Sequence, residues 1–165
     1  MTSKSFFLKT ILLSLTIISG IMLFNLYMNE YGLFGDVRGK SKIFCNNERT
    51  SKYLLSYKYI PTNFEGILIG PSLSDNLNTK DISGFKIYNT SISGGNISEL
   101  KLIAENVIQK GNLKFIIICL NYYITKDHGC KTSHMNPQEY WGSLGSKETI
   151  KLYIERILIK LGIRY

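Results

Sequence analysis

Residues that could take part in a chemical reaction follow three apolar segments of this 165-residue chain. Ser72 comes after residues 66–71, Gly-Ile-Leu-Ile-Gly-Pro, and the pair Gly94 and Gly95 follows residues 85–89, Phe-Lys-Ile-Tyr-Asn. Asn121 comes directly after residues 115–120, Phe-Ile-Ile-Ile-Cys-Leu. A serine just past the carboxyl end of a buried strand stands where open α/β sheets place their ligands, and a serine hydroxyl is a nucleophile once a base activates it. The spacing therefore indicates a nucleophile and two polar companions at one sheet edge.

The strands and helices that must position these residues are predicted to form an α/β domain. Apolar runs ended by Gly-Pro or by polar residues predict three buried strands at 66–69, 85–89 and 115–120. Asn96 and Glu99 form a capping-box pattern that begins a helix, and Gly111 ends it. The alternation of strand, turn, helix and strand is typical of a parallel sheet with crossover helices. We expect a three-layer parallel sheet of flavodoxin-like strand order.

Two further amphipathic helices flank this region. Residues 47–59, before Pro61, predict a short helix that packs on the sheet. Ser146 predicts the start of a final helix that also packs on the sheet. Its apolar stripe consists of Ile150, Tyr153, Ile154, Ile157, Leu158 and Leu161.

Residues 1–28 form a separate apolar segment, long enough to cross a bilayer as a helix. Lys4 and Lys9 precede or begin its apolar core, as in a signal sequence, but no small-residue pair of the A-x-A type ends it. We expect an uncleaved signal-anchor; the alternatives are a cleaved signal peptide and a loose hydrophobic helix. We divide the rest into a juxtamembrane loop and helix at 29–61 and an α/β domain at 62–165.

Charge gives little guidance on orientation or partners. The chain has 20 Lys and Arg against 12 Asp and Glu, a formal net charge of +8. The basic residues are scattered, which indicates a solvated surface and no nucleic-acid partner. The densest basic stretch, 38–58, either rests on anionic lipid headgroups or is ordinarily solvated. A long domain after a first anchor translocates regardless of nearby charge, so we expect a single-pass protein of the inner, cytoplasmic membrane with its domain outside.

The cysteines and histidines suggest no metal or cofactor site. Cys119 lies in the third apolar segment and is expected to be buried, whereas Cys45 and Cys130 are candidates for one disulfide if the domain is outside. No C-x-x-C pair occurs, and His128 and His134 lack further ligands at metal-binding spacing.

The three blocks together resemble those of SGNH/GDSL-type hydrolases, in particular membrane-anchored bacterial relatives that tailor envelope polysaccharides. Residues 62–124 carry the resemblance through I-L-I-G-P-S, Y-N-T-S-I-S-G-G-N-I-S-E-L and F-I-I-I-C-L-N, and the preceding Asn-Glu-Arg helix is similar in character. It implies that Ser72 is the nucleophile and that its own amide, the amide of Gly94 or Gly95, and the Asn121 side chain form an oxyanion hole. It also implies an esterase or O-acyltransferase acting on envelope glycans.

The family's D-x-x-H pair, which supplies the general base, does not occur in this sequence. His134 is then the candidate base, and we expect an incomplete and inactive SGNH-like domain, or one that needs the histidine of a partner. The partners considered are envelope polysaccharide and a membrane acyltransferase. Plainer interpretations stay open: Ser72 as a helix N-cap, the glycine pair as a turn, and Asn121 and His134 as loop residues. The alternative function is a non-catalytic, membrane-tethered module that binds envelope polysaccharide or a protein partner, or a small bitopic membrane protein that acts through interaction alone.

Overall fold

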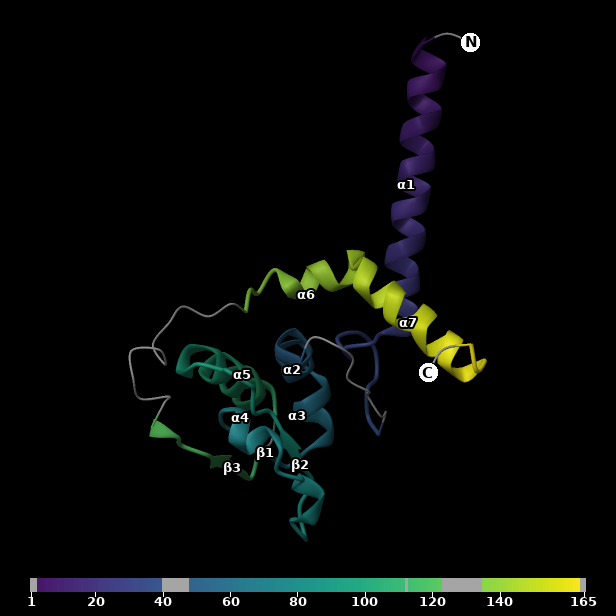
Figure 1. The fold of residues 1–165 in the computed structure, drawn as a ribbon. Coiled ribbons are helices and arrows are strands. Elements are labelled where there is room, and N and C mark those ends of the chain that lie inside the picture. The colour runs from purple at the N-terminus through teal and green to yellow at the C-terminus, as the bar shows by residue number, and fades with distance from the viewer. Residues whose placement is uncertain (1–2, 40–47, 112, 123–134, 164–165) are drawn as a thin grey trace. The chain divides into compact units, whose positions relative to one another are not determined.

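The computed structural model describes residues 3–39, 48–111, 113–122 and 135–163 (Figure 1). The chain divides into two compact units, Met1–Glu30 with Tyr140–Tyr165, and Tyr31–Glu139. Its elements, in chain order, are α1 (Ser3–Met28), α2 (Glu48–Ser56), α3 (Tyr59–Asn63), β1 (Gly66–Ile69), α4 (Ser72–Asp75), η1 (Thr79–Asp81), β2 (Ile87–Asn89), α5 (Ile97–Lys110), β3 (Phe115–Ile118), α6 (Glu139–Gly142), η4 (Ser143–Gly145) and α7 (Lys147–Lys160).

The second unit is built on a parallel sheet of three strands in the order β2-β1-β3. Ile67 of β1 lies between Tyr88 of β2 and Ile116 of β3, and Ile69 is aligned with Ile118. The α/β class and the parallel sheet predicted from the sequence are therefore confirmed. β2 and β3 are shorter than the predicted strands, since they begin at Ile87 and end at Ile118.

Helices α2, α3 and α5 pack against one another and cover one face of this sheet. Tyr88 makes edge-to-face ring contacts with Tyr59 of α3 and with Phe64 on this face. The core beneath them is aliphatic and aromatic; its fully buried members include Val37, Tyr53, Leu54, Leu55, Ile60, Ile67, Ile92, Ile103 and Val107. The predicted helix at 47–59 is present as α2, Glu48–Ser56; the short helix α3, which contains Pro61, was not predicted.

Local sequence signals account for the longest of these helices, α5. The Asn96 side chain accepts from the Glu99 amide at 3.0 Å, and the Glu99 carboxylate accepts from the Asn96 amide at 3.3 Å, which completes the predicted capping box. Gly111 ends the helix with an extended φ of −123°. A Cβ there would lie 2.7 Å from Cβ of Pro61, so the close approach to α3 requires glycine.

The third strand is more exposed than the sequence predicts. Phe115, Ile117 and Cys119 are half-buried, and Ile118 is 62% exposed. Among the described residues β3 pairs with β1 alone, which makes it an edge strand. An apolar run by itself does not distinguish an edge strand from a central one.

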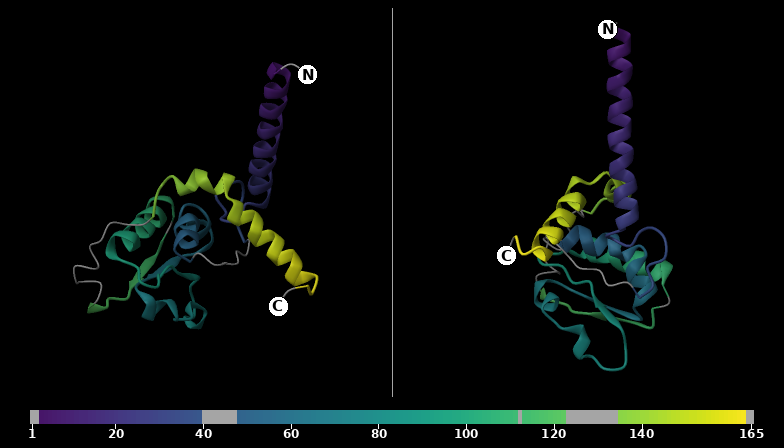
Figure 2. Two further views of the ribbon diagram at one scale, coloured as in Figure 1. Left: turned by 45° about the horizontal axis from the view of Figure 1, so that its top comes forward. Right: turned by 90° about the vertical axis from the view of Figure 1, so that its right-hand side faces the viewer.

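The first unit contains α1, a helix long and apolar enough to cross a membrane, with a mean hydropathy of 2.1 over its best window. Most of its side chains are exposed; Ser5, Ile21 and Met28 are half-buried, and Asn25 is buried. The Asn25 amide donates to the Leu144 carbonyl at 2.6 Å. Tyr153 of α7 packs on the Phe24 ring of α1 with the ring centroids 5.7 Å apart. The final helix, which the sequence analysis placed on the sheet, therefore makes its buried contact with the end of α1 (Figure 2).

Candidate functional site

The segments that follow β2 and β3 are hydrogen-bonded to the carboxyl end of β1 and to Gly70, at one edge of the sheet. The Thr90 amide donates to the Leu68 carbonyl at 2.8 Å, and the Ile92 amide donates to the Gly70 carbonyl at 3.0 Å. On the other side of β1, the Cys119 amide donates to the Ile69 carbonyl at 2.8 Å. The chain leads from this edge into Ser72, the glycine pair and Asn121.

Ser72 is exposed and begins the four-residue helix α4. The N-cap residue of α4 is Pro71, so the interpretation of Ser72 as the N-cap is wrong. Within the described part of the chain no hydrogen bond of the Ser72 hydroxyl is present. Just before it, Gly70 is tightly enclosed: a Cβ there would meet Oγ of Ser74 and would lie 2.8 Å from Cβ of Cys119.

The glycine pair forms a turn that leads into α5. Gly94 has a φ of +65°, a region that glycine adopts without strain. The Gly95 amide donates to the Ile92 carbonyl at 3.0 Å, so it is already bonded within the turn. Of the two amides considered as oxyanion donors, the Gly94 amide is the one that this turn leaves available.

Arg49 of α2 fixes the glycine turn from one side. Its Nη2 donates to the carbonyls of Ser93 and Gly94 at 3.3 and 3.2 Å, and its Nε lies 3.5 Å from the Glu99 carboxylate. Glu99 is fully buried, so the guanidinium compensates a charge that has no access to water.

Lys52, one turn further along α2, connects the segments after β1 and β2. Its Nζ donates to Glu48 at 2.8 Å, to Asp75 of α4 at 2.5 Å, and to the Ser91 carbonyl. Three acceptors use all three protons of an ammonium group. Lys52 is only 6% exposed. It is therefore neither solvated nor able to contact lipid headgroups, the two roles considered for the basic stretch 38–58.

Sequence reasoning did not identify Arg49 and Lys52 as part of this edge. The available signal was the spacing of Glu48 and Lys52, four residues apart on a predicted helix, which favours an ion pair. The burial of that pair depends on α4 and on the Ser91 loop, which are distant in the sequence.

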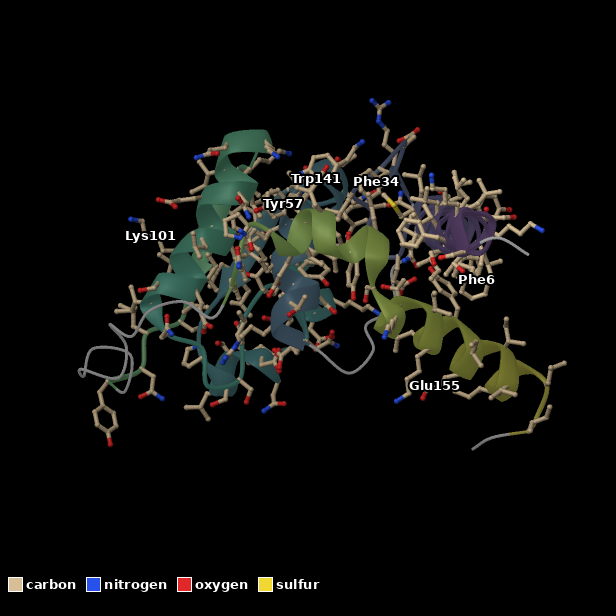
Figure 3. The ribbon with its side chains drawn as sticks, turned by 90° about the horizontal axis from the view of Figure 1, so that it is seen from above. Phe6, Phe34, Tyr57, Lys101, Trp141 and Glu155 are labelled. Carbon is tan, nitrogen blue, oxygen red and sulfur yellow. The ribbon has the colours of Figure 1, made fainter. Side chains whose placement is uncertain are left out.

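An apolar pocket of about 260 Å³ lies where β1 and β3 end beneath α5. Ile69, Ile118, Cys119 and Leu120 line it from the strands and the segment after β3; Ile97, Leu100, Lys101 and Ala104 line it from α5. Lys101 is the charged member of the lining; Figure 3 shows its side chain on the outer side of α5, in keeping with its 68% exposure. The pocket is larger than a cavity of about 150 Å³ that holds benzene.

Asn121 directly follows the pocket residue Leu120 and is half-buried. The candidate base His134 lies outside the described residues, as do His128 and the cysteines of the predicted disulfide, Cys45 and Cys130. No cluster of three or more His, Cys, Asp or Glu able to hold a metal occurs in the described ranges. The catalytic assignment of Ser72, Gly94, Gly95, Asn121 and His134 stays a prediction.

Two ionisable side chains, Glu139 and Tyr53, have raised pKa values. Burial raises the pKa of the Glu139 carboxyl, against a smaller opposing effect of a hydrogen bond with Thr50. Burial also raises the pKa of the Tyr53 hydroxyl, which lies 2.7 Å from the Tyr57 hydroxyl. Tyr53 belongs to α2 and Glu139 begins α6, and neither follows a strand of the sheet.

Comparison of the chain with protein-family models, with curated proteins and with solved structures finds no match.

Proposed function

We propose that this protein is a membrane-tethered SGNH-like domain that binds an acyl-bearing envelope glycan without releasing the acyl group. The observation that supports this most directly is the 260 Å³ apolar pocket at the carboxyl edge of the sheet. Ligand sites of α/β sheets are found at this edge, and apolar pockets with a few polar neighbours are typical of small-molecule binding. Ile69 of the pocket is three residues from Ser72, and Leu120 is next to Asn121.

The polar groups around Ser72 favour binding over turnover. The nearest ionisable side chain in its own helix, Asp75, is bonded to Lys52, and all three protons of Lys52 have acceptors. A serine nucleophile needs a base within hydrogen-bond reach, and neither Asp75 nor Lys52 is disposed to act as one. The sequence given also contains no D-x-x-H pair. Ser72 and Asn121 then serve as hydrogen-bonding groups for the sugar.

The strand order supports the fold part of this proposal. The order β2-β1-β3 is that of the first three strands of the flavodoxin-like arrangement, in which ligands bind where neighbouring connections leave in opposite directions. Here β1 lies between the other two, so its carboxyl end with Gly70 and Ser72 is at that point.

Helix α1 supports the membrane part. Its 26 residues give a length sufficient for a bilayer, and the large apolar side chains from Phe6 to Leu23 are exposed apart from the half-buried Ile21. We propose a single-pass anchor in the cytoplasmic membrane with the folded part on the outer side.

Two measurements on the purified full chain test the proposal. In the first, turnover of 4-nitrophenyl acetate and butyrate is compared between the wild-type protein and Ser72→Ala. We expect both to stay near the buffer rate. Turnover that disappears in Ser72→Ala contradicts the proposal and favours an active hydrolase.

The second measurement is carbonate extraction of membranes that contain the protein. We expect the full chain to stay in the membrane pellet with residues 1–28 attached, as shown by mass spectrometry. A soluble product that begins near residue 29 contradicts the anchor.

A further inference from the structure

The volume of the pocket between α5 and the end of β3 limits the size of the acyl group that fits it. This volume is about 260 Å³. A cavity of about 150 Å³ holds benzene, which corresponds to roughly 25 Å³ for each carbon atom and gives this pocket room for about ten carbons. An acetyl group, with its single methyl, would leave most of the apolar lining uncovered.

The length of the pocket gives a second measure of the acyl group. The lining on α5 begins at Ile97 and ends at Ala104. These residues lie about 10 Å apart along the helix axis, at about 1.5 Å per residue. A saturated chain of about eight carbon atoms, with bonds of about 1.5 Å in a zigzag, has nearly this length. Because volume and length give similar numbers of carbon atoms, the pocket is one chain wide.

The lining has the chemistry of a site for a saturated chain. Its members from the sheet and from α5 include the aliphatic side chains of Ile69 and Leu100. The Lys101 ammonium pairs with Glu105 at 3.6 Å on the outer side of α5 (Figure 3), so the methylene stem of Lys101 is the part that faces a bound chain. Such a lining favours methylene groups over sugar hydroxyls, which would lose their hydrogen bonds to water there.

The pocket is open on the side of β3. Ile118 and Leu120 of its lining are 62 and 78% exposed. A chain can therefore lie in the pocket while the sugar that carries it stays in solvent. Leu120 is next to Asn121, at the edge of the sheet where α5 begins. The ester end of the chain then belongs at this edge and its methyl end near Ala104, two turns along α5.

We propose that the acyl group held in this pocket is an unbranched chain of about eight to ten carbon atoms, and that Ala104 determines its length. The inference rests on the proposed function, since it takes the pocket as the acyl site. It goes further by naming the class of acyl group, a fatty acyl chain of medium length in place of acetyl. The small side chain of Ala104 leaves the space that the methyl end occupies.

Binding of glucose esters of increasing chain length tests this. The series consists of the acetate, butyrate, hexanoate, octanoate, decanoate and dodecanoate. Affinities are measured by calorimetry on the full chain held in amphipol, which leaves no free micelles to take up the esters. The variants are Ala104→Leu, which shortens the pocket, and Ile108→Phe, which adds bulk at an exposed position of α5 outside the lining.

We expect the affinity of the wild-type protein to rise about fourfold with each added methylene, equivalent to about 0.8 kcal/mol, and to level off at the octanoate or decanoate. Ala104→Leu should level off at a shorter chain and bind the acetate as wild type does. Ile108→Phe should keep the wild-type profile. The wild-type profile by itself decides the chain length if Ala104→Leu does not fold.

Three results would overturn the inference. An acetate bound as tightly as the octanoate, with binding weakened in Ala104→Phe, rejects the chain length and leaves the pocket as the acyl site. An affinity that rises through the dodecanoate equally in wild type and Ala104→Leu shows non-specific partitioning and rejects the role of Ala104. Absence of binding for every ester rejects the proposed function and the chain length with it.

Discussion

The Lys52 ammonium lies 2.5 Å from the Asp75 carboxylate and so joins α2 to α4 at the edge of the sheet where the candidate site lies. The same ammonium bonds to the Ser91 carbonyl, so one buried cation connects the segments after β1 and β2. The geometry of this edge therefore depends on a helix that lies before the sheet in the sequence.

Replacing Lys52 with methionine is expected to lower the free energy of unfolding by about 3 kcal/mol, because the carboxylate and carbonyl beside it lose their donor. The measurement is urea unfolding in detergent micelles. Lys101→Met is the control: Lys101 pairs with Glu105 at 3.6 Å on the surface, and its loss should change stability by less than about 0.5 kcal/mol. Equal losses in the two variants would contradict the role given to Lys52.

The pair of Arg49 and Glu99 predicts an asymmetry between two variants. Arg49→Met leaves the buried Glu99 carboxylate without its cation, and we expect a loss of about 2 to 3 kcal/mol. Glu99→Gln removes the buried charge and keeps an oxygen that accepts from the Asn96 amide, so its loss should be smaller. Thermal unfolding of both variants checks the order, and a larger loss in Glu99→Gln would show that the ion pair is not what fixes the glycine turn.

Gly70→Ala is expected to destabilise the protein by about 1 to 3 kcal/mol through overpacking. The added methyl group would lie 3.0 Å from the Cys119 carbonyl oxygen, which belongs to the segment after β3. Gly142→Ala is the matched control: it has open space around it and a helical φ of −58°, so alanine should stabilise by up to about 1 kcal/mol. Opposite shifts of the two unfolding midpoints are the predicted result; a Gly70→Ala protein as stable as wild type would refute the close approach.

Glu139 should make the protein less stable as the pH rises. Burial raises the pKa of its carboxyl above the ordinary value of 4.5, and one carboxylate oxygen is buried without a hydrogen bond to the described residues. Because the folded pKa lies above the unfolded one, the neutral form stabilises the fold below pH 4.5, and this contribution is lost as the pH rises through the folded pKa.

Glu139→Gln keeps the shape of the side chain without its charge. We therefore expect the variant to lose less stability than wild type over this pH window, and to be the more stable of the two at neutral pH. Thermal midpoints at a series of pH values measure this. Identical pH profiles of the two proteins would mean that Glu139 has no such effect.

The sequence predicted the parts of the fold that depend on local patterns. The apolar runs before Ser72 and Asn121 are strands, and the capping box of Asn96 and Glu99 begins α5 where expected. These features need only neighbouring residues, so periodicity and capping rules identify them.

Features that depend on distant partners were missed. The burial of Lys52 requires Asp75 and Ser91, and the exposure of Ile118 follows from its position on an edge strand. The stripe of α7 was recognised, but its contact with Phe24 comes from the other end of the chain. A stripe shows that a helix has an apolar side and does not show what covers it.

The pocket also offers a direct test by mutation. Ala104 lines it from α5, so Ala104→Phe should fill part of its volume and weaken binding of an acyl group, whereas Ile108→Phe, at an exposed position outside the lining, should not. Circular dichroism of both variants shows whether the fold is kept. Unchanged binding in a folded Ala104→Phe protein would place the ligand elsewhere.

The most direct test of the account is calorimetric titration of the full chain, in detergent micelles, with an O-acylated envelope oligosaccharide and with the same oligosaccharide after its acyl groups have been removed. Because burial of the acyl group in the pocket contributes to binding, we predict that the acylated form binds at least about tenfold more tightly. We also predict that mass spectrometry recovers it with its acyl groups intact. Equal affinity for the two forms, or acyl release that stops in Ser72→Ala, would contradict the account.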